Sequence, residues 1–520
     1  MSIATKGVHR RRPAKTSLQS GERLKRYAYI FGFSFFFVVM APADIVSDWL
    51  EELAPGSLWT LRYALIAVTL ILYAVKGEKA LFCGLALAYG GCSLLTMVFG
   101  DAPLIWAVRV AFPCVSTMLL VGAFARTRSD ELLWGMLIVM ASYSAINTIE
   151  LLYATVVNPN AFGRVAYTMI GYRNAFSRIY LPALIASVLL DARREKRFSL
   201  RSSLLLLAAL LQSCLAFSAT SAVELAFVVI GLALIQKRGI RRFMNAAVFG
   251  IGYLVLFLLL VVFRVQSIFG LFIEKVLHRS LDFTGRTELW DQTLAAVYPD
   301  HLLFGCPKGG APLLSLGNES FWTAHNGILD ILLWGGLLSL VVCLALITIV
   351  CVGLYNRRSD YSASLYSLLL GAFFIGALME SVMFVQFVFF LAMAYAYTRR
   401  EEIGVAGDIP NSGGRVKLSE PPTPCCHWIV PPLAQRPFGV DDETDSQSSA
   451  ARVRLCFEKK GARTEKKNHT AIELFARCDM LSCNFGQVGF SVVVERLNRG
   501  IRHRTRVMVT YNLLRTFTAA

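Results

Sequence analysis

Long apolar runs alternate with short polar segments through the first 400 residues of the chain. Most of these runs are close to the roughly 20 residues that an α-helix needs to cross a bilayer. The predicted spans lie at about 27–45, 57–75, 80–99, 103–124, 131–153, 175–191, 201–218, 220–236, 243–263, 324–354, 361–379 and 381–397. The pattern predicts an all-α polytopic membrane protein with about twelve transmembrane helices, or about ten if the runs meeting near residues 219 and 380 are single spans.

Lysine and arginine are concentrated in alternate connections between these runs. The connections after even-numbered spans carry them, from Lys76 and Lys79 to Arg399, whereas the short odd-numbered connections near 46–56, 100–102, 219 and 380 carry none. Because cytoplasmic loops are enriched in lysine and arginine, both termini are predicted to be cytoplasmic.

Two odd-numbered connections are long, and both contain arginine. Residues 154–178 and 264–323 are predicted as outer, periplasmic loops, the larger preceding the tenth span. Long loops cross the membrane whatever their charge, so these cations either carry no information or serve a function. The pattern leaves both interpretations open.

The predicted organisation has five parts. A basic cytoplasmic leader (1–26) precedes transmembrane helices one to nine (27–263), which include the outer loop 154–178. The large periplasmic loop (264–323) and the last three helices (324–400) follow. Residues 401–520 are polar and are predicted to form a disordered cytoplasmic tail without a packed domain.

Composition agrees with a membrane protein and argues against other classes. Hydrophobic residues make up 55% of the chain and charged residues 17%, whereas soluble domains are nearer a quarter charged. The net charge of +17 lies in short segments between apolar runs, as topology signals do, so no nucleic-acid partner is expected. The Cys425-Cys426-His427 cluster lacks metal-ligand spacing, and no metal or cofactor is predicted.

Ionisable residues inside the predicted spans share one side of the membrane. Given the predicted topology, each lies within about two helical turns of the outer end of its span. These residues are Arg62, Arg109, Glu150, Arg178, Glu224, Asp330 and Glu380. Charges at membrane depth usually face a bundle interior or a wet cavity, so this arrangement predicts a polar site open to the outer face.

The candidate chemistry lies between Asp282 and Gly336, the longest polar stretch among the apolar runs. Arg286 follows Gly285, and an arginine binds phosphate oxygens with a bidentate fork, although Arg286 could instead pair with Glu288 or Asp291.

His325 begins the next span, where an imidazole is suited to act as a general base or simply to bond a neighbouring backbone. For the adjacent Asn326 a helix cap is favoured over a role in orienting the histidine. Trp290 is predicted to be a membrane-interface anchor rather than a sugar platform.

Gly285-Arg286, Trp290, the Phe304-Gly305 turn and His325-Asn326, after eight or more spans, resemble the O-antigen ligase and polymerase family of bacterial inner-membrane proteins. The resemblance covers roughly residues 27–400 and is greatest for the branch that polymerises exopolysaccharide. Two departures stand out: no arginine follows Ser221, and Leu337 replaces the Ser or Thr common in ligases.

The resemblance implies glycan transfer from a polyprenyl (undecaprenyl) pyrophosphate carrier to an acceptor sugar hydroxyl at the periplasmic face, without a metal or nucleotide. Implied partners are the lipid-linked glycan, an acceptor glycan or lipid A-core, membrane lipid and other polysaccharide-assembly proteins. His325 and Arg286 would be catalytic. The implied substrate-binding residues are Arg178, Arg173, Arg164 and Asn326.

Two other classes remain open at this stage. A transporter or flippase for a polysaccharide or lipid-linked sugar would also have about twelve spans and a wet cavity. The absence of visible internal repeats and the one-sided charges speak against that class. A structural or sensory subunit without chemistry would leave the arginines of the outer loops unexplained.

Overall fold

The computed structural model describes residues 15–100, 102–194, 198–265, 285–306, 314–316, 319–399, 483–485, 488–496 and 505–513. The chain divides into two compact units, Met1–Ile409 and Pro410–Ala520.

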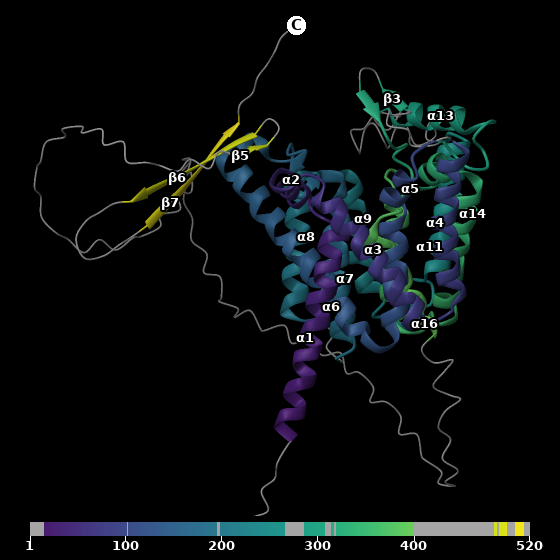
Figure 1. Cartoon of the computed structure of the whole chain (residues 1–520), viewed down its shortest axis with the longest axis horizontal. Helices are drawn as coiled ribbons and strands as arrows, with labels where there is room; N and C mark the ends of the chain where they lie inside the picture. The colour runs from purple at the N-terminus through teal and green to yellow at the C-terminus, as the bar shows by residue number, and fades with distance from the viewer. Residues whose placement is uncertain are drawn as a thin grey trace, which may run out of the picture. The chain divides into compact units, whose positions relative to one another are not determined.

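Unit one is a bundle of apolar helices that lie side by side (Figure 1). Its first half contains α1 (Lys15–Met40), α2 (Asp44–Leu53), α3 (Ser57–Lys76), α4 (Leu81–Phe99), α5 (Ile105–Val110), α6 (Phe112–Val157) and α7 (Ser177–Ala192). Its second half contains α8 (Leu200–Ala216), α9 (Ala219–Leu234), α10 (Arg238–Arg241), α11 (Ala246–Phe257), α13 (Arg286–Val297), α14 (Gly327–Asn356), α15 (Tyr361–Gly376) and α16 (Val385–Arg399).

Among the described residues, five helices are long and apolar enough to cross a membrane: α3, α4, α6, α14, and α7 with the turn before it. A sixth is reached if the bent pair α1–α2 counts as one span, and α8, α9, α11 and α15 are shorter apolar helices. A helical membrane protein is therefore the class that this fold supports. The count of twelve stays a prediction.

Two boundaries differ from the predicted ones, and one predicted break is present as a kink. α1 begins at Lys15, inside the segment predicted as a polar leader. α2 fills the connection predicted near 46–56, at 83° to the preceding helix, and buries none of its residues. The spans predicted at 103–124 and 131–153 meet within α6, where Arg128 alone leaves helical geometry (φ −134°, ψ 33°).

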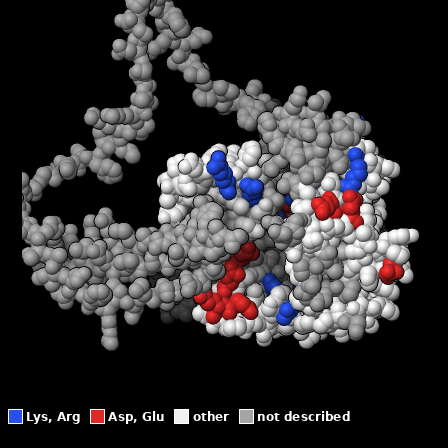
Figure 2. Space-filling view, turned by 90° about the horizontal axis from the view of Figure 1, so that it is seen from above, with Lys and Arg blue, Asp and Glu red and all other residues white. Residues whose placement is uncertain are grey.

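The described part of the connection 264–323 contains the helix α13 and a hairpin of β3 (Leu314–Leu316) and β4 (Glu319–Phe321). A smaller hairpin, β1 (Tyr167–Thr168) with β2 (Gly171–Tyr172), lies in the earlier loop. An apolar cluster under α13 includes Trp290, Leu314 and Leu329. Seen from the end that carries α13, the described surface is mostly uncharged, with charged side chains in a few separate places (Figure 2).

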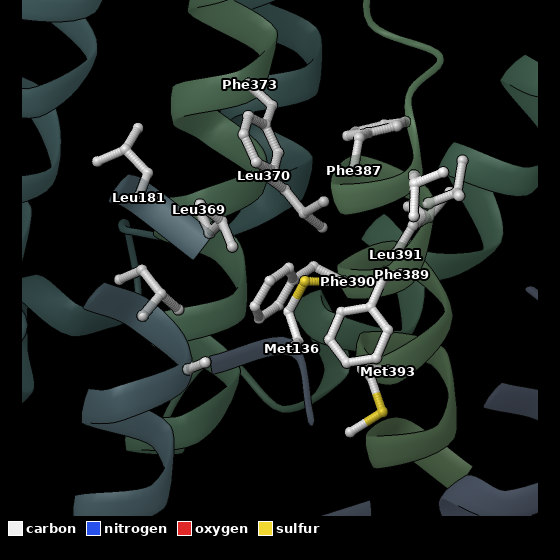
Figure 3. Packing of buried hydrophobic residues seen from close by; sticks show 14 of the residues in the cluster. Met136, Leu181, Leu369, Leu370, Phe373, Phe387, Phe389, Phe390, Leu391 and Met393 are labelled. Atoms are coloured by element: carbon white, nitrogen blue, oxygen red, sulfur yellow. The ribbon is translucent and has the colours of Figure 1, made fainter. Parts of the chain in front are cut away.

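The main core of the bundle is rich in phenylalanine, methionine and leucine. Met136 of α6, Leu181 of α7, Phe373 of α15 and Phe387 of α16 belong to this one cluster of buried side chains (Figure 3). Lipid tails are as apolar as these side chains, so close van der Waals packing must supply the stabilisation between helices. Glycines permit it: a Cβ at Gly135 of α6 would lie 2.7 Å from the Cβ of Phe33 in α1.

The described residues of unit two form one antiparallel sheet of β5 (Cys483–Phe485), β6 (Val488–Arg496) and β7 (Thr505–Leu513). The sequence analysis did not predict these strands. The signal was present in β7, where Val507, Val509, Tyr511 and Leu513 alternate with other residues.

α14 is interrupted at Gly336, whose backbone is left-handed and non-helical (φ 63°, ψ −167°). The segment 302–306 crosses the break: the Cys306 amide donates to the Leu333 carbonyl (2.6 Å), and the Leu337 amide donates to the Leu302 carbonyl (2.8 Å). The segment 302–306 thus satisfies backbone groups that the break exposes, as buried polar groups require.

The two backbones at this crossing leave no room for a side chain. Gly305 has φ 74°, and a Cβ there would lie 2.6 Å from the amide nitrogen of Gly336. We expect Gly305→Ala to destabilise the protein by about 1–3 kcal/mol, through strain and forced separation. The measurement is the thermal unfolding midpoint in detergent.

The matched control is Gly84→Ala in α4, where a new Cβ would meet nothing within 4 Å. Its midpoint should be unchanged or slightly raised, because alanine favours helix over glycine. Equal midpoints for both variants would contradict the close crossing.

Candidate functional site

The start of α14 fixes the position of His325. Asn326 caps the helix, its side-chain oxygen accepting from the amides of Ile328 and Leu329 at 3.2 Å each. His325 itself has φ 51°, an uncommon conformation for a residue with a side chain. The Asn326 cap and the positive φ of His325 together fix the backbone from which the imidazole projects.

Two further hydrogen bonds hold the residue before His325. The buried indole of Trp290 donates to the Ala324 carbonyl at 3.1 Å, and the Ala324 amide donates to Asp330 at 2.6 Å. The predicted interface-anchor role of Trp290 is wrong, since the side chain is 0% exposed. Its amphipathic ring instead packs in the apolar cluster and ties α13 to the start of α14.

Arg286 opens α13 on the other side of that cluster. The preceding Gly285 has φ 82°, and a Cβ there would collide with Leu316 of β3, so the helix can begin against the hairpin only with glycine. Neither Glu288 nor Asp291 pairs with Arg286. Asp291 is bonded instead to Arg264, at 2.5 Å.

Glu380, in the connection between α15 and α16, is the centre of the site. Its Oε1 accepts from Arg286 Nη2 at 2.8 Å and from Asn174 Nδ2 at 3.1 Å. Its Oε2 lies 3.2 Å from His325 Nδ1 and 3.7 Å from Arg178 Nη2. One carboxylate therefore joins residues from four parts of the chain.

The balance of charge keeps Glu380 ionised. Burial raises the pKa of this carboxyl, but the hydrogen bond with His325 and the nearby positive charges outweigh burial and hold the pKa below the ordinary 4.5. An ionised carboxylate only accepts hydrogen bonds, so the hydrogen in this contact belongs to His325 Nδ1, and in a neutral imidazole with that tautomer Nε2 has the free lone pair. This tautomer is the one that accepts a proton at Nε2.

The side chains that contact Glu380 remain partly accessible. His325, Arg178 and Arg286 are 28%, 24% and 19% exposed, against 11% for Glu380. Arg178 Cζ also lies 4.8 Å from the centre of the Phe384 ring, a cation–π contact. Glu380 is therefore the most buried of the four side chains, and the two arginines and His325 remain accessible to a ligand.

Neighbouring residues extend this network. Asn174 accepts from Ser218 at 3.0 Å, which connects the cluster to the start of α9. Glu224 of α9 is buried at 4% exposure and interacts electrostatically with Arg178 and Glu380. Asp330, buried in α14, accepts from Ser381 beside Glu380.

The predicted site residues divide into four groups, of which Asn326 is the last. His325, Arg286 and Arg178 meet at Glu380. Arg173, next to Asn174, is half-buried, and its Nε has no hydrogen-bond partner among the described residues. Arg164 is exposed, and no ion pair of the described residues includes it.

Asn326 has a structural position rather than the predicted substrate-binding one. It is 0% exposed, and besides capping α14 it donates from Nδ2 to the Leu378 carbonyl at 3.0 Å. The helix cap favoured by the sequence is confirmed.

The sequence analysis identified Glu380 as an outer charge but missed its central role, and it missed Ser218. The remaining outer charges lie in other contacts: Arg62 and Arg109 both stack on Trp59, at 4.5 and 4.7 Å, and Glu150 accepts from the Met169 amide at 2.8 Å. The ionisable residues predicted to lie on one side of the membrane therefore do not all belong to one cluster.

Within the described ranges, no group of three or more His, Cys, Asp or Glu side chains is arranged to hold a metal ion. Comparison with protein-family models, with curated proteins and with solved structures finds no match for this chain.

Because Glu380 has a lowered pKa, its charge should stabilise the fold above the ordinary glutamate range and lose that effect as pH falls below about 4.5. We expect Glu380→Gln to cost roughly 3 kcal/mol at pH 7, since it leaves two arginines without their buried partner. The difference in unfolding midpoint between wild type and Glu380→Gln, followed from pH 7 to pH 3, measures this. A difference that stays constant over the whole range would contradict the assignment.

Proposed function

We propose that the protein transfers a glycan from a polyprenyl-pyrophosphate carrier to a sugar hydroxyl, as a polysaccharide polymerase or an O-antigen ligase does. The observation that carries the proposal is the meeting of Arg286, Arg178 and His325 at one buried carboxylate. Cations for an anionic leaving group and a base for a hydroxyl are the two chemical needs of this reaction.

The arginines suit a pyrophosphate. Each guanidinium has five N–H donors, and the contact of Arg286 with Glu380 uses only one of its two Nη groups. The Nε atoms of Arg286 and Arg173 are buried without a hydrogen-bond partner among the described residues. Phosphate oxygens would satisfy such donors, which favours an anionic ligand here.

His325 would be the general base. Its Nε2 accepts the proton of the acceptor hydroxyl while the oxygen forms a bond to the anomeric carbon. The bond from that carbon to the pyrophosphate oxygen breaks, and the lipid pyrophosphate leaves with the electron pair towards the arginines. Glu380 orients the imidazole and stabilises its protonated form, as a buried carboxylate does in other histidine bases.

The proposed setting is the bacterial inner membrane. About twelve spans, with both termini cytoplasmic, would place the Glu380 cluster at the periplasmic face, where lipid-linked glycans are assembled. The concentration of lysine and arginine in alternate connections supports this orientation.

The experiment complements a deletion strain with wild type, His325→Ala or Arg286→Ala, with membrane expression confirmed for each. We expect either variant to reduce long glycan by about 100-fold or more, because a general base and an oriented cation each contribute on that order. Glycan length on gels and the lipid-linked intermediates are measured.

The controls are His301→Ala and Arg238→Ala, since both side chains are exposed and lie outside the Glu380 cluster. These variants should keep normal glycan. Single lipid-linked units would then indicate a polymerase, and completed chains held on the carrier a ligase. Normal glycan in both site variants would refute the proposal, and units trapped on the inner face would indicate the flippase instead.

A further inference from the structure

A second site lies at the opposite end of α16 from Glu380. A cavity of about 500 Å³ is lined by residues of α4, α6 and α16 and of the connection before α4. α16 has 15 residues, so its two ends are about 22 Å apart. The cavity therefore belongs to the other face of the bundle and plays no part in the chemistry described above.

The cavity has an apolar floor and a charged mouth. Phe82, Met118 and Ala392 line it and are at most 2% exposed, so they form the floor. Arg126 pairs with Glu78 at 3.0 Å, and these side chains are 56% and 38% exposed, so they form the mouth.

Arg399 completes the mouth. Its Nη1 donates to the Tyr395 hydroxyl at 3.1 Å, and both side chains line the cavity. Two guanidinium groups against the single carboxylate of Glu78 leave the lining with one net positive charge. Lys76 adds a cation nearby, 5.9 Å from the ring of Phe124 in α6.

We propose that this cavity binds an anionic phospholipid, with its phosphate between Arg126 and Arg399 and the start of an acyl chain over the apolar floor. An apolar pocket under a basic rim, beside α4 and α6, which are long and apolar enough to cross a membrane, matches the chemistry of such a lipid. A soluble anion would use the rim and leave the floor without a partner. The basic connections at this end assign it to the cytoplasmic leaflet, which is rich in anionic lipid.

The test uses the full-length protein in detergent. Phosphatidylglycerol, phosphatidylcholine or inorganic phosphate is added, and lipid retention by native mass spectrometry and the unfolding midpoint are both recorded. We expect phosphatidylglycerol to be retained and to raise the midpoint more than phosphatidylcholine does. The double variant Arg126→Gln with Arg399→Gln should bind it about tenfold or more weakly, since each basic residue near the lipid contributes several-fold.

Two variants separate this effect from loss of folding. Ala396→Phe fills the half-exposed wall of the cavity without changing its charge and should also abolish the preference for phosphatidylglycerol. Arg358→Gln removes a cation outside the cavity lining and should behave as wild type. The proposal fails if all variants retain phosphatidylglycerol equally. It also fails if inorganic phosphate alone reproduces the stabilisation, which would indicate a soluble anion.

Discussion

The buried carboxylate of Glu380 is the constraint on which the end of the bundle next to α13 depends. Removing a carboxylate from water costs several kcal/mol, and the contacts of Arg286, Arg178 and His325 offset that cost. The backbone around Glu380 reinforces the arrangement: the Gly327 amide donates to the Ala377 carbonyl at 2.7 Å. Segments that are far apart in the chain can therefore satisfy their charges only in this mutual position.

The connection before α14 is held in that position by backbone hydrogen bonds as well as by side-chain contacts. The break in α14 at Gly336 exposes backbone groups, and the segment around Gly305 supplies their partners. Phe304 extends the crossing to α4, where its ring stacks on Phe99 at 4.2 Å and its carbonyl accepts from Thr96 at 2.5 Å. These contacts fix the polar segment against the apolar helices, and the helix α13 within it therefore gives Arg286 a defined position.

Hydrophobic runs predicted the helical segments well because apolar length is a local property of the sequence. They placed a break between residues 124 and 131, where α6 is kinked at Arg128, but not the angle of the bend, since that angle depends on tertiary packing. Charge placement indicated that Arg178 and Glu380 share one end of the bundle. It could not indicate that they are partners, or that Trp290 is buried, because contacts across long sequence separations leave no periodic signal.

The carboxylate of Glu380 also affects how tightly an anion could bind at this site. Any phosphate that approaches Arg286 competes with Glu380 for the guanidinium, so an added negative charge gains only part of the attraction that an unpaired arginine would offer. In return, the arginine and the imidazole are already oriented, and little side-chain entropy remains to be lost on binding. Such a site binds the ground-state anion less tightly than free arginines would, but it holds the reacting groups in a fixed geometry. This favours catalysis, because only interactions that are stronger in the transition state accelerate a reaction.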